Sequence, residues 1–516
     1  MEEILFYGDD MVLCSLPDET ERIYANPGLT PATDPDGEIR RALDEPLGMP
    51  RIEDLVNSRS RVVVAFDDPC VPVPRPLRDP RKKMVGQVLQ RLFRAGVAPE
   101  KVNLICANGL HRKFRRSEIA ALLGKEVMSA VPAGNISSHD GTQDLVRLGE
   151  TGDGHEVDVN RLCTEADLTI YANVNFTTMN GGWKSLLVGL GSWESIRRHH
   201  NPDLWNGKDS IFCPQRSGMH RMLAGMGKVA EKKVRVFQME CVVDNRLWPG
   251  PLSGLLAPLG APGRGDRPMS AVIKGALKAS GFLPDRAKAF VRNSLRSGYR
   301  LCRVHAGQVD AVHEKTLALV FGQQNVAVEQ QADIAVLGVP NLSPYAVGSE
   351  QNPILLRSLT LGYLAGAHMG KPLVREGGVI VALNPGREVF DKNEHPSYYD
   401  FWTRELPEHF DPELCWRELA EKYAADTRYL SMYRTGFAYH GTHSLMNWMW
   451  SGMALKSLSA VILAGAKEPA TAEKMGFVPA RDLSTALAMA RERLGRDARI
   501  ICPVIPPLFA VDVAPG

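Results

Sequence analysis

A glycine turn that carries a lysine, followed downstream by a histidine, is the feature of this sequence with the most evident chemistry. The turn is Asn180-Gly181-Gly182-Trp183-Lys184, and His200 follows the lysine by sixteen positions. Glycines permit close backbone approach, and a lysine amine can hold a cofactor covalently. A neutral imidazole is a common ligand for late transition metals. The combination suits a tethered metal cofactor, although taken alone such residues more often form a plain turn with a surface lysine.

A second group of polar residues follows apolar runs that read as buried strands. Asn108-Gly109-Leu110-His111 comes after the run 102–106, Asp68 after the run 61–66, and Asn173 and Asn175 after the run 168–172. Open α/β sheets bind their ligands just beyond the carboxyl ends of the strands. A histidine there can accept and return a proton near neutral pH, because its ordinary pKa is about 6.5.

The elements that must position these residues alternate between strand-like and helical patterns, which predicts an α/β fold with largely parallel sheets. An amphipathic helix is indicated where apolar residues recur at helical spacing, at Val85, Val88, Leu89, Leu92 and Phe93. Further strands are expected at 332–339, 378–383, 460–465 and 499–505, and further helices at 117–123, 270–279, 285–297, 354–367 and 484–494.

The pattern divides the chain into three parts. Residues 1–248 are expected to form an N-terminal α/β cofactor-binding domain, 249–303 a basic helical insertion, and 304–516 a C-terminal α/β domain; whether the last strand returns to the first domain is left open. An active-site cleft is expected between the two domains, where ligands commonly bind.

The insertion is rich in positive charge, with ten Lys or Arg and two Asp between residues 264 and 303. A basic arm for a polyanion or an acidic substrate is one interpretation. A solvated helical insertion is favoured, because only Phe282, Phe290 and Tyr299 lie among these basic residues, without the regular alternation that a single-strand nucleic-acid platform requires. We therefore expect no nucleic-acid partner.

Composition excludes several other classes. The net charge of the 516 residues is only +2, and the nine cysteines are scattered without any Cys-x-x-Cys pair. Such cysteine usage favours a reducing cytoplasm over a disulfide framework or a compact zinc site. The acidic start Met1-Glu2-Glu3-Ile4 does not read as a secretory signal, and no apolar run approaches the ~20 residues of a membrane span. A cytoplasmic protein without a membrane partner is expected.

A series of short motifs in one order along the chain resembles the nickel-pincer-nucleotide lactate racemase family. A collinear series is more specific than any one of its pieces. The resemblance covers much of the chain outside residues 249–303. It is carried by Asp68 with Pro72-Val73-Pro74, Asn108-Gly109-Leu110-His111-Arg112, His139-Asp140, Leu148-Gly149, Val157-Asp158-Val159-Asn160-Arg161, Glu165-Ala166-Asp167, Gly181-Gly182-Trp183-Lys184-Ser185, Gly189-Leu190, Ser195-Ile196, His200, His305-Ala306-Gly307 and His313.

The resemblance implies a cofactor and roles for several residues. The cofactor is a nickel-pincer nucleotide, nickel pyridinium-3,5-bisthiocarboxylic acid mononucleotide, which takes a hydride from a 2-hydroxy acid and returns it to the opposite face. Lys184 matches the tethering lysine, His200 the histidine ligand of nickel, and His111 one of two acid/base histidines. Asp68 joins the candidate catalytic set, and Gly181, Gly182, Trp183 and Asn175 are the other candidate cofactor-binding residues.

The chain departs from the family pattern at three positions. Val174 stands where the family has its second catalytic histidine, and Val71 where it has an arginine after the aspartate. Arg75 or Arg78 is a possible substitute for that arginine. The substrate-binding lysine of the family falls near Arg357 or Ser358, and a guanidinium there can pair with a carboxylate.

Other residues are candidates for the missing base. His440 and His443 lie in Tyr439-His440-Gly441-Thr442-His443, and Tyr345 is a further candidate. For the histidine pair, a plain loop or helix-start role is the more common one. His199, beside His200, is expected to be a solvated helix residue.

The leading hypothesis is a racemase or epimerase of a 2-hydroxy acid other than lactate. One alternative keeps the cofactor for one-sided hydride chemistry, as an oxidoreductase or an isomerase of sugar acids. Another is a non-catalytic descendant of the fold that binds a metabolite. The expected partners are the substrate and the enzymes that make the cofactor, and the oligomeric state is left open.

Overall fold

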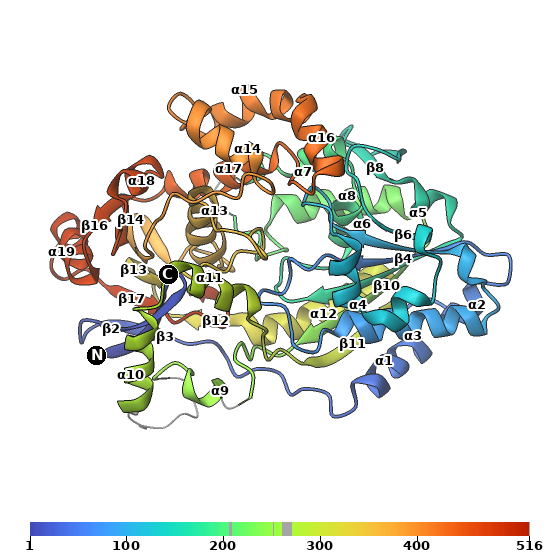
Figure 1. Ribbon diagram of the computed structural model, residues 1–516, viewed down its shortest axis with the longest axis horizontal. Helices are drawn as coiled ribbons and strands as arrows, with labels where there is room; N and C mark the ends of the chain where they lie inside the picture. The colour runs from blue at the N-terminus through green and yellow to red at the C-terminus, as the bar shows by residue number, and fades with distance from the viewer. Residues whose placement is uncertain (206–208, 251, 261–270, 515–516) are drawn as a thin grey trace.

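Two six-stranded sheets, each covered by helices on both faces, form the body of the protein (Figure 1). The computed structural model describes residues 1–516 except 206–208, 251, 261–270 and 515–516. The predicted α/β fold with largely parallel sheets is confirmed, since β10–β11 is the one antiparallel pair in the two large sheets of the described chain. Figure 1 shows the first sheet with its helices at the right and the second at the left.

The first sheet has the order β11-β10-β9-β4-β5-β6. Its strands are β4 (Val62–Asp67), β5 (Val102–Ala107), β6 (Ile136–Ser138), β9 (Leu168–Asn175), β10 (Val236–Val243) and β11 (Leu301–Gly307). Alternate residues of β4 enter different cores: Val62, Val64 and Phe66 pack on one face, Val63 and Ala65 on the other. Burial of both faces explains why these strands read as continuous apolar runs.

Helices on the two faces of this sheet arise from the expected patterns. On one face lie α1 (Pro35–Asp44), α3 (Pro80–Arg94) and α4 (Arg116–Ser129), and on the other α6 (Trp183–Gly189) and α8 (Gly218–Ala230). Helix α7 (Trp193–His199) contacts α6 and α8, while its Trp193 and Ile196 pack into the core of the second half. The predicted apolar stripe falls on α3, where Val85, Val88, Leu89 and Leu92 are buried and Phe93 is partly buried. Asp79 caps this helix by accepting from the Arg81 amide.

The second sheet has the order β16-β15-β14-β13-β17-β3 and is parallel throughout. Its strands are β3 (Glu21–Ile23), β13 (Ala332–Gly338), β14 (Val374–Leu383), β15 (Ala460–Ala464), β16 (Val478–Ala480) and β17 (Ile500–Pro503). The helices packed against it include α13 (Pro353–Ser358), continued by the π-helical turn Leu359–Leu364, with α15 (Pro412–Ala425), α17 (His443–Leu455) and α19 (Leu483–Leu494).

The sheets do not divide the chain in simple order. The early strand β3 belongs to the second sheet, whereas β11 joins the first sheet after the insertion. The predicted last strand, β17, lies in the second sheet, and the later strand β18 (Ala510–Val513) pairs with β12 (Asn325–Val328). The proposed domain limits at 248 and 303 remain predictions.

The insertion lies against an acidic hairpin formed by β1 (Glu2–Tyr7) and β2 (Asp10–Ser15). It contains α9 (Leu252–Leu255), α10 (Ala271–Ser280) and α11 (Asp285–Ser294); the first residue of the helix predicted at 270–279 is outside the described residues. Lys288 pairs with Asp10 at 2.6 Å and Arg292 with Asp9 at 2.9 Å. Part of the basic charge is therefore neutralised within the chain.

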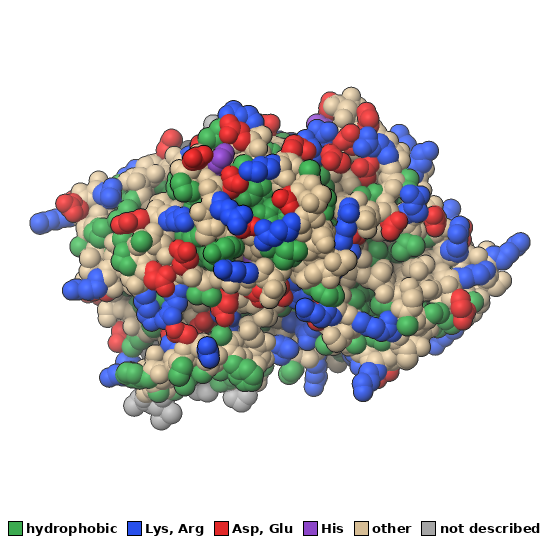
Figure 2. Space-filling model, turned by 45° about the horizontal axis from the view of Figure 1, so that its top comes forward, with side chains coloured by type: hydrophobic (Ala, Val, Ile, Leu, Met, Phe, Trp, Pro, Cys, Tyr) green, Lys and Arg blue, Asp and Glu red, His purple; other side chains and the backbone are tan. Residues whose placement is uncertain are grey.

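The surface mixes both signs of charge. Figure 2 shows Lys and Arg side chains interspersed with Asp and Glu over one face. Among the described helices, none has the length and apolar character that crossing a bilayer requires.

Candidate active site

A cavity of about 170 Å³ is lined by residues from both halves of the chain. Loops at the carboxyl edge of the first sheet and helices α6 and α7 supply Asp68, His111, Lys184 and His200. The second half supplies an aromatic and neutral wall, made by Tyr345, Tyr363, His443, Asn447 and Trp450. Strands β9, β4 and β5 are neighbours in the sheet, so residues distant in sequence converge at one edge.

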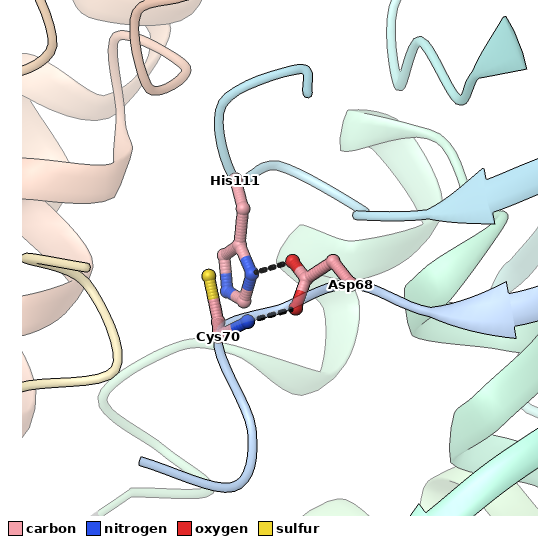
Figure 3. A group of neighbouring side chains, drawn as sticks. All are labelled: Asp68, Cys70 and His111. Carbon is pink, nitrogen blue, oxygen red and sulfur yellow. Dashed lines mark hydrogen bonds and ion pairs between the residues drawn. The ribbon is translucent and has the colours of Figure 1, made fainter. Parts of the chain in front are cut away.

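Asp68 and His111 form a carboxylate–imidazole pair at this edge (Figure 3). Asp68 Oδ2 lies 2.7 Å from His111 Nδ1, and Asp68 Oδ1 accepts from the Cys70 amide at 3.0 Å. Burial alone would raise the pKa of Asp68, but His111 and these hydrogen bonds lower it, so the carboxylate is ionised. An ionised carboxylate only accepts, so His111 Nδ1 carries the proton and Nε2 is left as a base.

The lysine of the glycine turn is partly buried and lines the cavity. Lys184 is the second residue of α6, and its Nζ donates to the Met179 carbonyl at 3.0 Å. Burial lowers the pKa of Lys184 to about 8, against the opposing charge of Asp67. An amine with a depressed pKa is a better nucleophile near neutral pH, as a covalent tether requires.

Gly181 and Gly182 make this placement possible through left-handed backbone, with φ of +91° and +59°. A Cβ on Gly181 would lie 2.5 Å from Asn175 Oδ1, and one on Gly182 would lie 2.7 Å from the His313 ring. The turn therefore tolerates no side chain at either position. Gly181 lines the cavity, while Gly182, Trp183 and Asn175 do not.

His200 ends α7 and lines the cavity, with its Nδ1 2.7 Å from Nδ1 of His199. Burial, with the neighbouring His199 and Lys184, lowers the pKa of His200 well below its ordinary value, so the ring is neutral. A neutral imidazole is the form that binds a metal. The prediction for His199 was wrong: it is fully buried, because α7 packs inward at this turn.

Comparison with known proteins relates the chain to lactate racemases. The lactate racemase N-terminal domain family matches residues 7–210. Lactate racemases of Lactiplantibacillus plantarum and Thermoanaerobacterium thermosaccharolyticum are 26% and 27% identical over 174 and 168 residues. The fold matches the lactate racemase apoprotein of the latter organism with a TM-score of 0.64 and 19% identity, over 99% of this chain and 100% of that one. Residues 7–210 thus carry the likeness to the lactate racemase N-terminal domain, and the whole chain shares its fold with that apoprotein.

The lactate racemase resemblance is uneven along the sequence. The matched segments are 33% and 31% of this chain and only 39% and 37% of the two curated lactate racemases. A Thermotoga maritima protein also shares the fold, with a TM-score of 0.50 and 14% identity over 93% of this chain and 98% of that one. The second half of the chain is thus related to solved structures by fold alone.

At position 174, where the resemblance implies a second catalytic histidine, the side chain is hydrophobic. Val174 lines the cavity, and its amide donates to Asp67 Oδ2 at 2.6 Å. Tyr171 also donates to Asp67, at 3.1 Å. Burial raises the pKa of Asp67 to about 7, although Arg81 opposes the shift. Asp67 is a titratable group that the sequence reasoning missed, although it directly precedes Asp68.

His440 and His443 were the two histidines proposed as the missing base, and of these the structure brings only His443 to the cavity. Its ring centroid lies 5.3 Å from that of His111. Tyr345, the third candidate, lines the same wall, and its hydroxyl lies 2.6 Å from that of Tyr363. His440 lies outside it, stacked on Trp193, with Nδ1 bonded to Thr442 Oγ1 at 2.8 Å.

The tautomer of His443 follows from its partners. Ser358 Oγ donates to Asn447 Oδ1 at 2.7 Å, which orients the amide so that Nδ2 donates to Tyr398 Oη at 3.0 Å. The Tyr398 hydroxyl lies 2.6 Å from His443 Nδ1 and can donate to it. Burial, followed by the charge of His111, lowers the pKa of His443 well below its ordinary value. The neutral ring then carries its proton on Nε2.

The arginine candidates are not in the cavity. Arg357 is fully buried, donates to the Met475 and Trp448 carbonyls at 3.0 and 2.9 Å, and stacks on the Trp448 ring at 3.8 Å. We correct its assignment to substrate binding, because the packing of α13 against α17 encloses the side chain. Arg75 lines a different cavity, and Arg78 is exposed.

Two buried charged residues support the site without lining it. Glu240 on β10 accepts from the Gly182 amide and from Asn175 Nδ2, both at 2.7 Å, and lies 3.2 Å from His313 Nδ1. Arg81 donates to the carbonyls of Asp67 and Asp68 at 3.0 and 2.6 Å. Glu240 could have been noticed in the sequence as a single acidic residue within an apolar run. No feature of the sequence around Arg81 predicts its role.

Cys70 Sγ, Asp68 and His111 are close enough together to suggest metal ligands (Figure 3). Burial and the Asp68 charge raise the pKa of the Cys70 thiol well above its ordinary value. Because a thiolate is the form that binds metal, this favours the carboxylate–imidazole pair over a metal site here.

Proposed function

We propose that this protein is a racemase or epimerase of a 2-hydroxy acid other than lactate, with a nickel-pincer nucleotide tethered to Lys184. The single observation that carries the proposal is that Lys184, His200 and His111 open into one cavity. The match of residues 7–210 to the lactate racemase N-terminal domain family supports the reaction class.

The residues present fit such a cofactor. Lys184 offers a buried amine of lowered pKa, and His200 offers a neutral imidazole. Asn108 lines the cavity, and its buried Oδ1 has no hydrogen-bond partner among the described residues. A buried acceptor without a partner is costly unless a ligand satisfies it. When bound, the cofactor supplies the centre that takes and returns a hydride.

The chain itself supplies the proton chemistry. His111 Nε2 takes the proton of the substrate hydroxyl, and Asp68 stabilises the imidazolium that results. His443, from the opposite wall, donates a hydrogen bond from Nε2 to the oxygen that becomes a carbonyl and keeps its proton. The aromatic wall, together with Val71 and Val174, favours a substrate other than lactate.

The test is to produce the protein together with the cofactor-making enzymes and measure intact mass and nickel in the same sample. We expect a covalent adduct that Lys184→Ala removes, with loss of racemisation. Full nickel and full activity in that variant would overturn the proposal, and absence of any adduct would favour the non-catalytic metabolite-binding alternative.

One-sided hydride chemistry, as an oxidoreductase or sugar-acid isomerase, is the second candidate, because His111 and His443 are chemically unequal. Turnover in deuterated water separates the two. A racemase gives both configurations with the carbon-bound hydrogen retained, whereas the alternative gives a single product.

A further inference from the structure

A second cavity, of about 310 Å³, shares no lining residue with the active site in the described part of the chain. Four segments line it: the loop after β4 at 69–75, residues 112–121 at the start of α4, the loop after β13 at 341–348, and the end of α11 at 292–296. Four arginines contribute, namely Arg75, Arg112, Arg292 and Arg296.

Two of these arginines are paired with carboxylates. Arg112 lies 2.7 Å from Glu118 and 3.4 Å from Glu394. Arg292 lies 2.9 Å from Asp9 and 3.4 Å from Glu350. Their charges are therefore balanced within the protein.

Arg75 and Arg296 are not balanced in this way. Neither forms an ion pair with any described residue, and Arg296 donates only to the carbonyls of Asn293 and Leu295, at 3.4 and 2.9 Å. The Arg75 side chain has no hydrogen-bond partner among the described residues. Glu118 lines the same cavity, but Arg112 and the Arg115 amide occupy its carboxylate.

The backbone holds these two arginines beside one cavity. The Ser297 amide donates to the Arg75 carbonyl, and the Leu77 amide to the Ser297 carbonyl, both at 3.0 Å. Both arginine side chains are half-buried. Burial and the charge of Arg296 lower the pKa of Arg75, although the charges of Asp79 and Glu118 oppose the shift. Two guanidinium groups in a partly dry cavity repel each other unless an anion lies between them.

We propose that this cavity binds a phosphate group between Arg75 and Arg296. A dianion balances two positive charges, and the planar guanidinium fork matches the spacing of phosphate oxygens. The ligand is either inorganic phosphate or the phosphomonoester of a metabolite. The proposal is independent of the reaction in the active site, because it requires only the charges and shape of this cavity.

Calorimetric titration of the full chain with inorganic phosphate tests the proposal, with ionic strength held constant by chloride. We expect saturable binding that weakens by about tenfold or more in Arg75→Gln and in Arg296→Gln. The matched control is Arg78→Gln, since Arg78 is exposed and does not line the cavity. A parallel titration with glycerol phosphate distinguishes the sources: tighter binding than inorganic phosphate identifies a phosphomonoester ligand, and weaker binding identifies the free ion.

Thermal unfolding gives a second readout that a merely structural arginine would not produce. Without phosphate, Arg75→Gln is expected to leave Tm unchanged or raise it, because it relieves repulsion; phosphate is expected to raise Tm only in the wild type and the control. No phosphate binding by the wild type, or equal binding by the double variant, would overturn the proposal.

Discussion

His111 and His443 face each other across the cavity from the two halves of the chain, with ring centroids 5.3 Å apart. Asp68 lies behind His111, whereas a tyrosine hydroxyl lies behind His443. A carboxylate stabilises an imidazolium, and a neutral hydroxyl does not. In the proposed function the first half therefore supplies a base and the second half a neutral donor, and with Val174 in place of a histidine these two partners are unequal.

The largest expected effect follows from the removal of Lys184, the proposed anchor of the cofactor. Lys184→Ala should lower activity by on the order of 10⁴-fold or more, because it removes the anchor of the reactive group. Steady-state assays with intact mass measure both consequences. Lys228→Ala, on the exposed side of α8, is the matched control and should retain full activity.

Removal of the base should come next. We expect His111→Gln to lower kcat by roughly 10²- to 10⁴-fold, the usual contribution of a positioned acid or base. Asp68→Asn should have a smaller effect, about 10- to 100-fold, and should shift the acidic limb of the pH–rate profile. If Asp68→Asn left both rate and profile unchanged, the assignment of His111 as the base would fail.

Variants of the opposite wall sharpen the comparison. His443→Gln should lower kcat by about 10- to 100-fold, since it removes a donor but not the base. Tyr398→Phe should lower kcat by less than about tenfold, because Asn447 Nδ2 also donates a hydrogen bond to the His443 carbonyl. Equal losses in His111→Gln and His443→Gln would instead indicate two equivalent acid/base groups.

The smallest expected effect is on the pH dependence of stability, through His395, which contacts the wall residue Tyr345. His395 donates to the Tyr345 carbonyl at 2.8 Å, and burial lowers its pKa to about 4. In the unfolded state His395 binds a proton below about pH 6.5, whereas in the folded state it binds one only below about pH 4. The free energy of unfolding therefore falls as the pH drops through this window. His395→Asn should reduce that slope by up to about 1.4 kcal/mol per pH unit.

Urea unfolding at several pH values between 4.5 and 7 measures this slope. Several groups act in the opposite direction. Burial raises the pKa of Asp67 to about 7 and also raises those of Asp244 and Glu394, and Glu240 raises the pKa of His313 against the effect of burial. They are the same in wild type and variant, so the difference in slope isolates His395. Identical slopes would contradict its burial as a neutral group.

Much of the first half could be predicted from sequence because its signals are local. An apolar run followed by a polar turn places Asp68 and His111 at a sheet edge, and the glycines before Lys184 fix the turn within a few residues. The predicted strand at 168–172 ended too early, however. The strand continues to Asn175 because it pairs with β10, and this pairing cannot be predicted from the neighbouring residues in the sequence.

The sequence by itself determined the α/β fold, the glycine turn with its lysine, and the histidines at positions 111 and 200. Only the tertiary structure decided that His443 reaches the cavity while His440 packs on Trp193. It also decided that Arg357 is fully buried and that Glu240 accepts a hydrogen bond from the Gly182 amide of the glycine turn. The physical reason is that helix and strand patterns are set by neighbours in sequence. Contacts across the cavity depend on how two separately formed sheets pack together.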